Sequence, residues 1–254
     1  MRRSHFTKPA RMIAALLTGL LFAVLTGCSS TAVTPLPPVL AATSGSGQSA
    51  TVGAAFAASL VTTATTNNGT PVSGLSVTFT APAESGSPNT VATCTFAGGG
   101  TTETDTTASN GTASSSPCTT TTVSGAYTVA VTAFPALGAA FSLTNVSGPP
   151  AAIAATSGTP QTATVSTAFT DPLVATVTDS DGNPVSGASV TFKAPSSGAS
   201  GAFANGTNTE TDTTDANGDA TSSTFTANAT SGGYTVTATV TGVATPADFS
   251  LTNH

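Results

Sequence analysis

An internal repeat governs what this chain can fold into. Residues 71–74 (PVSG) recur as residues 184–187, and residues 76–79 (SVTF) recur as residues 189–192, both 113 residues later. Residues 102–107 (TETDTT) recur 107 residues later as residues 209–214, so the first copy is longer by 113 − 107 = 6 residues. Self-similarity at a fixed spacing indicates one structural unit used twice. The sequence therefore predicts two domains, 39–146 and 147–254.

Within each copy, apolar residues alternate with hydroxyl residues. Leu75, Val77 and Phe79 share one parity, with a serine and a threonine between them, and the pattern returns at 188–192 and 234–240. This period of two is typical of antiparallel strands with one buried face. Asn-Gly pairs at 68–69, 110–111 and 217–218 supply turns between the runs. We expect an all-β fold of two tandem antiparallel β-sandwiches, each with about seven short strands.

The first 27 residues have the features of an export signal. A basic start is followed by an apolar run at 12–24, which is too short for the roughly 20 residues that span a membrane. The run leads into residues 25–28 (LTGC), which resemble the bacterial lipobox. That resemblance implies cleavage of signal peptide 1–27 and lipidation of Cys28, while Ser29 favours the outer membrane as destination. Residues 28–38 then form a flexible linker rich in Pro, Ser and Thr. An ordinary signal peptide with a chance cysteine is the alternative.

Charge and histidine usage exclude several classes of function. Of five Lys and Arg residues, only Lys193 lies beyond residue 11, against eleven Asp and Glu in the whole chain. One base cannot neutralise a run of phosphates, so we expect no nucleic-acid partner. The two histidines are His5 and His254, which leaves the interior without an imidazole base or metal ligand. We expect a protein that is not an enzyme and has no cofactor, apart from the calcium hypothesis below.

Several motifs resemble one family. Residues 181–187 (DGNPVSG), 190–192 (VTF), 213–220 (TTDANGDA) and 233–238 (GYTVTA) closely resemble bacterial Ig-like domains of the invasin/intimin type. The resemblance covers about 39–145 and 150–253, and it is weaker in the first copy. It implies two tandem Ig-like β-sandwiches of a kind found as extracytoplasmic modules on adhesins and other surface proteins. It also implies a non-catalytic module, although the fold alone names no ligand.

Cys94 and Cys118 are the two cysteines that follow Cys28. Cys94 shares parity with Phe96, and Cys118 aligns with Phe225 of the second copy, so both are expected in the core. An even pair outside the cytoplasm indicates a disulfide. Two buried free thiols are the alternative.

The second copy carries two acidic turns. Asp179 and Asp181 lie in the first turn, and Asp215 and Asp219 lie in the second, so together they form a weak candidate calcium site. Asp, Asn and Gly are also ordinary turn residues, and the first copy lacks most of these acids, so turn chemistry alone is the alternative.

Two further carboxylate pairs lie on strands. Glu103 with Asp105, and Glu210 with Asp212, are two residues apart and therefore share a face. We expect that face to be solvated rather than part of a catalytic cleft.

These observations predict a non-catalytic, lipid-anchored cell-envelope protein whose tandem Ig-like modules serve as a surface stalk or adhesion module. We expect it at the outer membrane, on the cell surface rather than the periplasmic face. Its partners would be the membrane, through Cys28, and an unidentified host, cell-surface or glycan ligand. The alternative function is a periplasm-facing carbohydrate-binding or envelope-polymer-binding protein.

Overall fold

The computed structural model describes residues 36–86, 90–134 and 138–254. The predicted signal peptide, the predicted lipidation site Cys28 and most of the predicted linker lie outside these residues. The described ranges contain strands and no helix, as the all-β prediction requires. Consequently, no described helix has the length and apolar character needed to cross a membrane.

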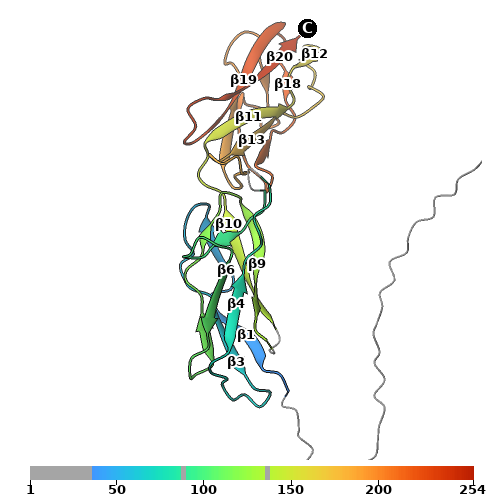
Figure 1. The fold of residues 1–254 in the computed structure, drawn as a ribbon. Helices are drawn as coiled ribbons and strands as arrows, with labels where there is room; N and C mark the ends of the chain where they lie inside the picture. Colours follow the sequence, from blue (N-terminus) through green and yellow to red (C-terminus); the bar gives the residue numbers. More distant parts are fainter. Residues whose placement is uncertain (1–35, 87–89, 135–137) are drawn as a thin grey trace, which may run out of the picture. The chain divides into compact units, whose positions relative to one another are not determined.

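Within the described ranges, each copy of the repeat builds ten strands (Figure 1). Those of the first copy are β1 Val39–Ser44, β2 Gln48–Thr51, β3 Val61–Thr65, β4 Ser76–Thr80, β5 Cys94–Thr95, β6 Thr102–Thr106, β7 Thr112–Ser114, β8 Thr119–Thr120, β9 Gly125–Thr132 and β10 Ala139–Val146. Those of the second are β11 Ala152–Ser157, β12 Gln161–Ala163, β13 Val174–Thr178, β14 Ser189–Lys193, β15 Gly201–Ala202, β16 Thr209–Thr213, β17 Asp219–Thr221, β18 Thr226–Ala227, β19 Gly232–Val240 and β20 Ala247–Asn253.

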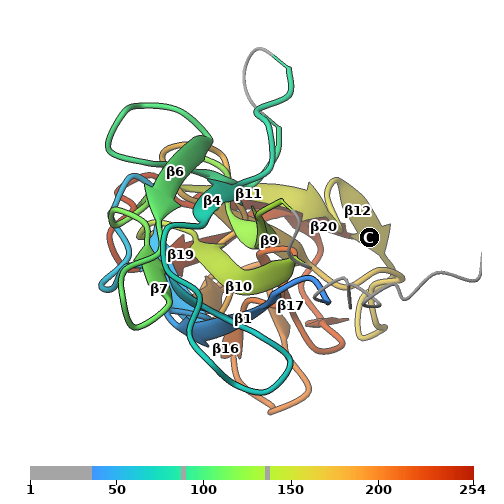
Figure 2. The ribbon, with the colours of Figure 1, turned by 60° about the horizontal axis from the view of Figure 1, so that its bottom comes forward.

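Two sheets face each other in each sandwich. In the first copy a three-stranded sheet, β1-β3-β7, packs on a five-stranded sheet, β2-β10-β9-β4-β6 (Figure 2). The second copy repeats both orders as β11-β13-β17 and β12-β20-β19-β14-β16. No strand pairing joins the two copies in the described ranges, and each copy has its own hydrophobic cluster. The β-sandwich prediction is confirmed, whereas the exact boundary between residues 146 and 147 stays a prediction.

The predicted alternation explains each core. Val77 and Phe79 on β4 are fully buried, while Ser76 and Thr78 on the other face are exposed or half-buried. Val190 and Phe192 repeat this on β14. At roughly 1.5–3 kcal/mol for each fully buried large apolar side chain, these inward positions provide the main stabilisation of the sandwich.

The expected seven strands become ten because the first strand of each copy divides in two and a small two-stranded sheet, β5-β8 in the first copy and β15-β18 in the second, adds two more. The chain leaves β1, turns at Gly45 and continues as β2 in the opposite sheet, where it pairs parallel with β10. Gly45 has φ +95°, and a Cβ atom there would collide with the carbonyl oxygen of Ser59. Gly158 makes the same turn in the second copy. Only glycine tolerates both the positive φ and the close approach of the backbone. This explains why residues 41–45 and 154–158, which both read AATSG, end in glycine in both copies.

Candidate functional site

The two cysteines of the first sandwich form a disulfide. Cys94 on β5 and Cys118 just before β8 are joined, with their Cα atoms 5.7 Å apart, and both side chains are buried. The predicted inward orientation of both residues is confirmed. A buried sulfur already held in a disulfide offers no thiolate for nucleophilic or redox chemistry. The pair is therefore a structural element of the first core.

The second sandwich fills the same space with an aromatic ring. Gly201 stands where the first copy has Cys94, and Phe225 stands where it has Cys118. A Cβ atom on Gly201 would lie 2.7 Å from the tip of the Phe225 ring, so the ring occupies the volume that a side chain would take. Phe225 also packs on Phe203, with ring centroids 4.6 Å apart. One copy thus uses a covalent link where the other uses an aromatic ring packed over glycine.

The acidic turn after β13 is organised by Asp179. This side chain is only 3% exposed. Its Oδ1 accepts hydrogen bonds from the backbone N–H groups of Asp181 and Asn183 at 3.0 and 2.8 Å, and its Oδ2 accepts one from Gly148 N–H at 2.8 Å. Burial by itself raises the pKa of the Asp179 carboxyl, but these bonds and the Asn183 amide outweigh it and hold the pKa below its ordinary value. The carboxylate therefore fixes both its own turn and the segment between the sandwiches.

Asn183 extends this turn to the preceding sandwich. Its Nδ2 donates to the carbonyl oxygen of Thr122 at 2.8 Å, and its Oδ1 accepts from Ser124 N–H at 2.9 Å. The same Nδ2 also donates to Asp179 Oδ2 at 2.9 Å. We call Thr122, Ser124, Gly148, Asp179 and Asn183 the polar junction. It connects the β8–β9 loop, the inter-sandwich segment and the second sandwich through side chains that are almost fully buried.

The first copy has no equivalent of the polar junction. Thr66 and Thr70 replace Asp179 and Asn183, and the Thr66 hydroxyl bonds within its own turn, to Asn68 and to Thr70. In the sequence this difference is visible only as a weaker family resemblance of the first copy, and the junction is not predicted from it. The available signal was a polar position that differs between copies while its surroundings are repeated.

The structure does not assemble the candidate calcium ligands. Asp215 accepts hydrogen bonds from the backbone N–H groups of Asn217 and Asp219, and Asp219 accepts one from the Thr176 hydroxyl. Asp181 is exposed. In the described part of the chain, no three His, Cys, Asp or Glu side chains come together as a metal site. Calcium binding by Asp179, Asp181, Asp215 and Asp219 stays an untested prediction.

The paired carboxylates correct one expectation. Glu103 and Glu210 are half-buried rather than solvated. Glu103 accepts bonds from Ser116 N–H and, at 2.7 Å, from its hydroxyl, and Glu210 accepts the same two bonds from Ser223. These glutamates lie on the edge strands β6 and β16 and hold the chain that leaves β7 and β17. Each glutamate thus ties the edge strand of the five-stranded sheet to the chain that leaves the edge strand of the three-stranded sheet, through charge-assisted hydrogen bonds.

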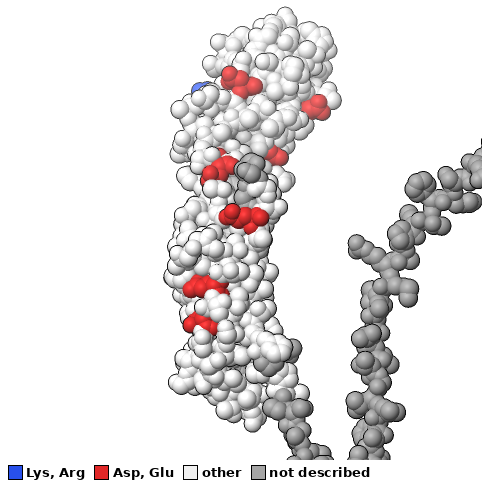
Figure 3. Space-filling model, in the orientation of Figure 1, with Lys and Arg blue, Asp and Glu red and all other residues white. Residues whose placement is uncertain are grey.

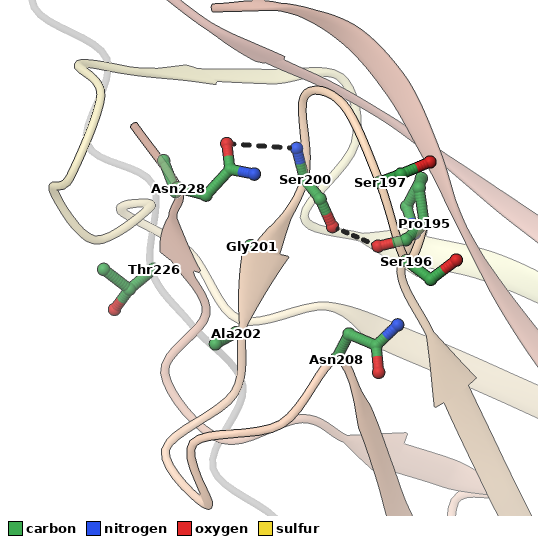
Figure 4. Close-up of a pocket in the computed structure, with 10 residues that line it drawn as sticks. Pro195, Ser196, Ser197, Ser200, Gly201, Ala202, Asn208, Thr226 and Asn228 are labelled. Carbon is green, nitrogen blue, oxygen red and sulfur yellow. Dashed lines mark hydrogen bonds between the residues drawn. The ribbon is translucent and has the colours of Figure 1, made fainter. Parts of the chain in front are cut away.

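A shallow groove of about 430 Å³ lies on the second sandwich (Figure 4). Figure 4 shows that Ser200 bonds to Asn228 and to the carbonyl oxygen of Pro195, so these polar groups serve the fold itself. Ser196 and Ser197 are exposed at the rim. No aromatic side chain is among the ten that line the groove, which are Pro195, Ser196, Ser197, Ser200, Gly201, Ala202, Asn208, Thr226, Ala227 and Asn228.

The visible surface is sparsely charged. Figure 3 shows carboxylates in small, separate groups and one basic group on a face that is otherwise uncharged. Lys193 is the one base in the described ranges, so no basic patch can form there.

Comparisons with known proteins agree with the fold. The sequence matches no protein-family model and no curated protein at a significant level. The solved structure of Yersinia pseudotuberculosis InvD is similar over 85% of this chain, with 18% identity and a TM-score of 0.50. The structure of FdeC, an Escherichia coli adhesin, is similar over 84% of this chain, with 20% identity and a TM-score of 0.40. The structure of invasin, an integrin-binding protein, is similar over 86% of this chain, with 21% identity and a TM-score of 0.34.

The likeness to InvD shows the fold, which is that of invasin/intimin-type Ig-like β-sandwiches. The chain spans 56% of the InvD structure, 63% of the FdeC structure and 39% of the invasin structure. The similarity therefore concerns repeated modules that occur as parts of larger proteins.

Proposed function

We propose that this protein is a non-catalytic, lipid-anchored cell-envelope protein whose two Ig-like modules form a surface stalk or adhesion module. The observation that carries the proposal is the polar junction. Asn183 makes two hydrogen bonds to the preceding sandwich, and Asp179 restrains the connecting segment through Gly148. Inter-domain motion is the default for tandem domains, so a buried, hydrogen-bonded junction favours a role in holding modules in a set relation.

Anchoring would occur through Cys28. The lipobox resemblance of residues 25–28 supports this part of the proposal. Each buried methylene adds about 0.8 kcal/mol to membrane binding, so several acyl chains would hold the protein firmly where one chain would not.

The absence of a catalytic constellation in the described residues supports a non-enzymatic role. The carboxylates with defined partners serve turns and edge strands, and the cysteine pair is a disulfide. A ligand would then be met by exposed loops, as is usual for rigid scaffolds. Host surfaces, other cell surfaces and glycans are the candidate partners, in keeping with the adhesin FdeC and the integrin-binding protein invasin.

Protease shaving of intact cells tests this proposal. A tag placed after His254 should be lost when protease is added to whole cells, while a periplasmic control protein stays intact. The Cys28→Ala variant should lose membrane association, as measured by fractionation. A tag protected in intact cells and cleaved only after the outer membrane is permeabilised would contradict surface display.

The groove of Figure 4 is the one observation that favours the alternative, a periplasm-facing carbohydrate or envelope-polymer binding protein. Its exposed serines could bond to sugar hydroxyls. The lack of an aromatic platform among its lining residues weighs against it, since apolar and aromatic side chains dominate most ligand pockets. If the protein binds peptidoglycan fragments and the Ser196→Ala/Ser197→Ala variant does not, this alternative function would be supported.

A further inference from the structure

Exposed apolar side chains gather at one end of the first sandwich. Four large apolar residues are exposed in the described part of the chain: Leu36, Val39, Phe134 and Val146. The first three lie at this end, whereas Val146 lies at the opposite end, because β10 runs antiparallel to β9. Phe134, just after β9, is 94% exposed and Leu36 is 72% exposed. Phe134 differs in this from the other phenylalanines of the first sandwich, which are buried. A single exposed apolar residue is ordinary, so the inference depends on Leu36 and Val39 being exposed at the same end.

The repeat shows which residues share this end. In the second sandwich, Pro149, Pro150, Val240 and Thr241 line one hollow, so the entering chain and the end of β19 are neighbours. The same positions in the first sandwich are Leu36, Pro37, Ala133 and Phe134. Figures 1 and 2 show the start of β1 and the end of β9 at one end of this sandwich. Phe134 therefore lies at the end of the first sandwich where the described chain begins, at Leu36.

The connection to Cys28 is short. Eight residue steps separate Cys28 from Leu36, and at 3.3–3.6 Å per residue they reach at most about 29 Å. A chain anchored through Cys28 would therefore hold Leu36 within about 29 Å of the anchor, which is short enough for this end of the first sandwich to approach the lipid headgroups. The hollow beside the ring is lined by Ser76, Thr78, Thr132 and Ala133, so it presents hydroxyl and methyl groups without a charge.

The second copy lacks this feature. Thr241 occupies the position of Phe134, and Pro149 and Pro150 of the connecting segment lie against it. The aromatic ring is thus specific to the module nearest the predicted anchor.

We propose that Phe134 is a membrane-contact residue that inserts into the headgroup region of the bilayer holding the Cys28 anchor. This inference rests on the proposed lipid anchor. The acyl chains supply the affinity, and Phe134 sets which end and which side of the first sandwich meets the lipid. The occupant is a zwitterionic or uncharged lipid surface, because the described residues provide a single base with which to attract anionic lipid.

The chain contains no tryptophan, so one introduced at this position is a unique optical probe. Phe134→Trp and the matched control Thr241→Trp should be prepared as the full lipidated chain in phosphatidylcholine vesicles. Mass spectrometry establishes the acyl chains on Cys28. Emission is then compared between ordinary vesicles and vesicles of brominated phosphatidylcholine, which quenches only tryptophan in contact with lipid.

We expect brominated lipid to quench Phe134→Trp and to leave Thr241→Trp unchanged. If Cys28 carries lipid and Phe134→Trp emits at long wavelength without quenching, the ring faces water and the proposal is overturned. Short-wavelength emission without quenching would place the ring against a second copy of the chain, which also overturns it. A chain without lipid on Cys28 would refute the anchor itself, and the membrane contact with it.

Discussion

Removing the Asn183 side chain should weaken the second sandwich measurably. Asn183→Ala deletes the hydrogen bonds to Thr122 and Ser124, at 2.8 and 2.9 Å. At a net 0.5–1.5 kcal/mol per hydrogen bond, the cross-module share of the loss is about 1–3 kcal/mol. A loss of 1.4 kcal/mol corresponds to a tenfold change in the folding equilibrium, so the effect is easily measured.

The two tyrosines make a module-specific assay possible. Tyr127 lies on β9 and Tyr234 on β19, and the chain has no tryptophan. Burial raises the pKa of Tyr127, and that of Tyr234 to about 12, so both phenols stay protonated in neutral buffer. Urea unfolding followed by tyrosine fluorescence in a Tyr127→Phe background reports the second sandwich alone. The midpoint shift, at unchanged slope, gives the loss of stability.

Two controls isolate the junction. Thr70→Ala alters the equivalent, exposed position of the first sandwich; read in a Tyr234→Phe background, in which Tyr127 reports that sandwich, it should change stability by no more than about 0.5 kcal/mol. In the separate fragment 147–254, which lacks the Thr122 and Ser124 partners, Asn183→Ala should cost less than in the full chain. An equal loss in fragment and full chain would refute the inter-module role of Asn183.

Three further predictions concern stability. Reducing the disulfide, or replacing it in Cys94→Ala/Cys118→Ala, should lower the folding stability of the first sandwich by about 3 kcal/mol, because the bridge closes a 24-residue span. The stability of the second sandwich should not change, and urea midpoints with and without reductant measure both. Gly201→Ala should destabilise the second sandwich by about 1–3 kcal/mol through overpacking, whereas Gly98→Ala, which meets no atom within 4 Å, should be neutral. The pKa of Asp179 is lower in the folded state than in the unfolded state, so its carboxylate contributes to folding stability. That contribution should be complete above the ordinary pKa of about 3.9 and should be lost as the pH falls through the lowered pKa. Urea midpoints measured over a pH series test this, and an Asp179→Asn variant with the same pH dependence as the wild type would contradict it.

Local pattern was enough to predict the β-sandwiches and their cores. The parity of Val77 and Phe79 placed both inside, and the alignment of Cys118 with the buried Phe225 placed the cysteine in the core. These inferences succeed because side-chain direction along a strand depends only on sequence position.

Features that depend on distant segments were not predicted. The division of β1 from β2 depends on Gly45 lying against Ser59, and the burial of Glu103 depends on Ser116, thirteen residues away. Asn183 reaches a loop about sixty residues earlier in the chain. No local pattern encodes such partners. The one indication in the sequence is that Asp179 and Asn183 are replaced by threonines in the first copy, although the residues around them are repeated.

The exchange of a disulfide for a packed aromatic ring gives the two halves of the chain different requirements during biogenesis. The first sandwich reaches its full stability only after oxidation of Cys94 and Cys118, whereas the second, closed by Phe225 over Gly201, needs no oxidant. In a reducing compartment the second sandwich would therefore keep its folding stability, whereas the first sandwich would be destabilised. Cells deficient in disulfide formation should accumulate a proteolytic fragment that begins near the inter-sandwich segment and retains an intact C-terminal tag.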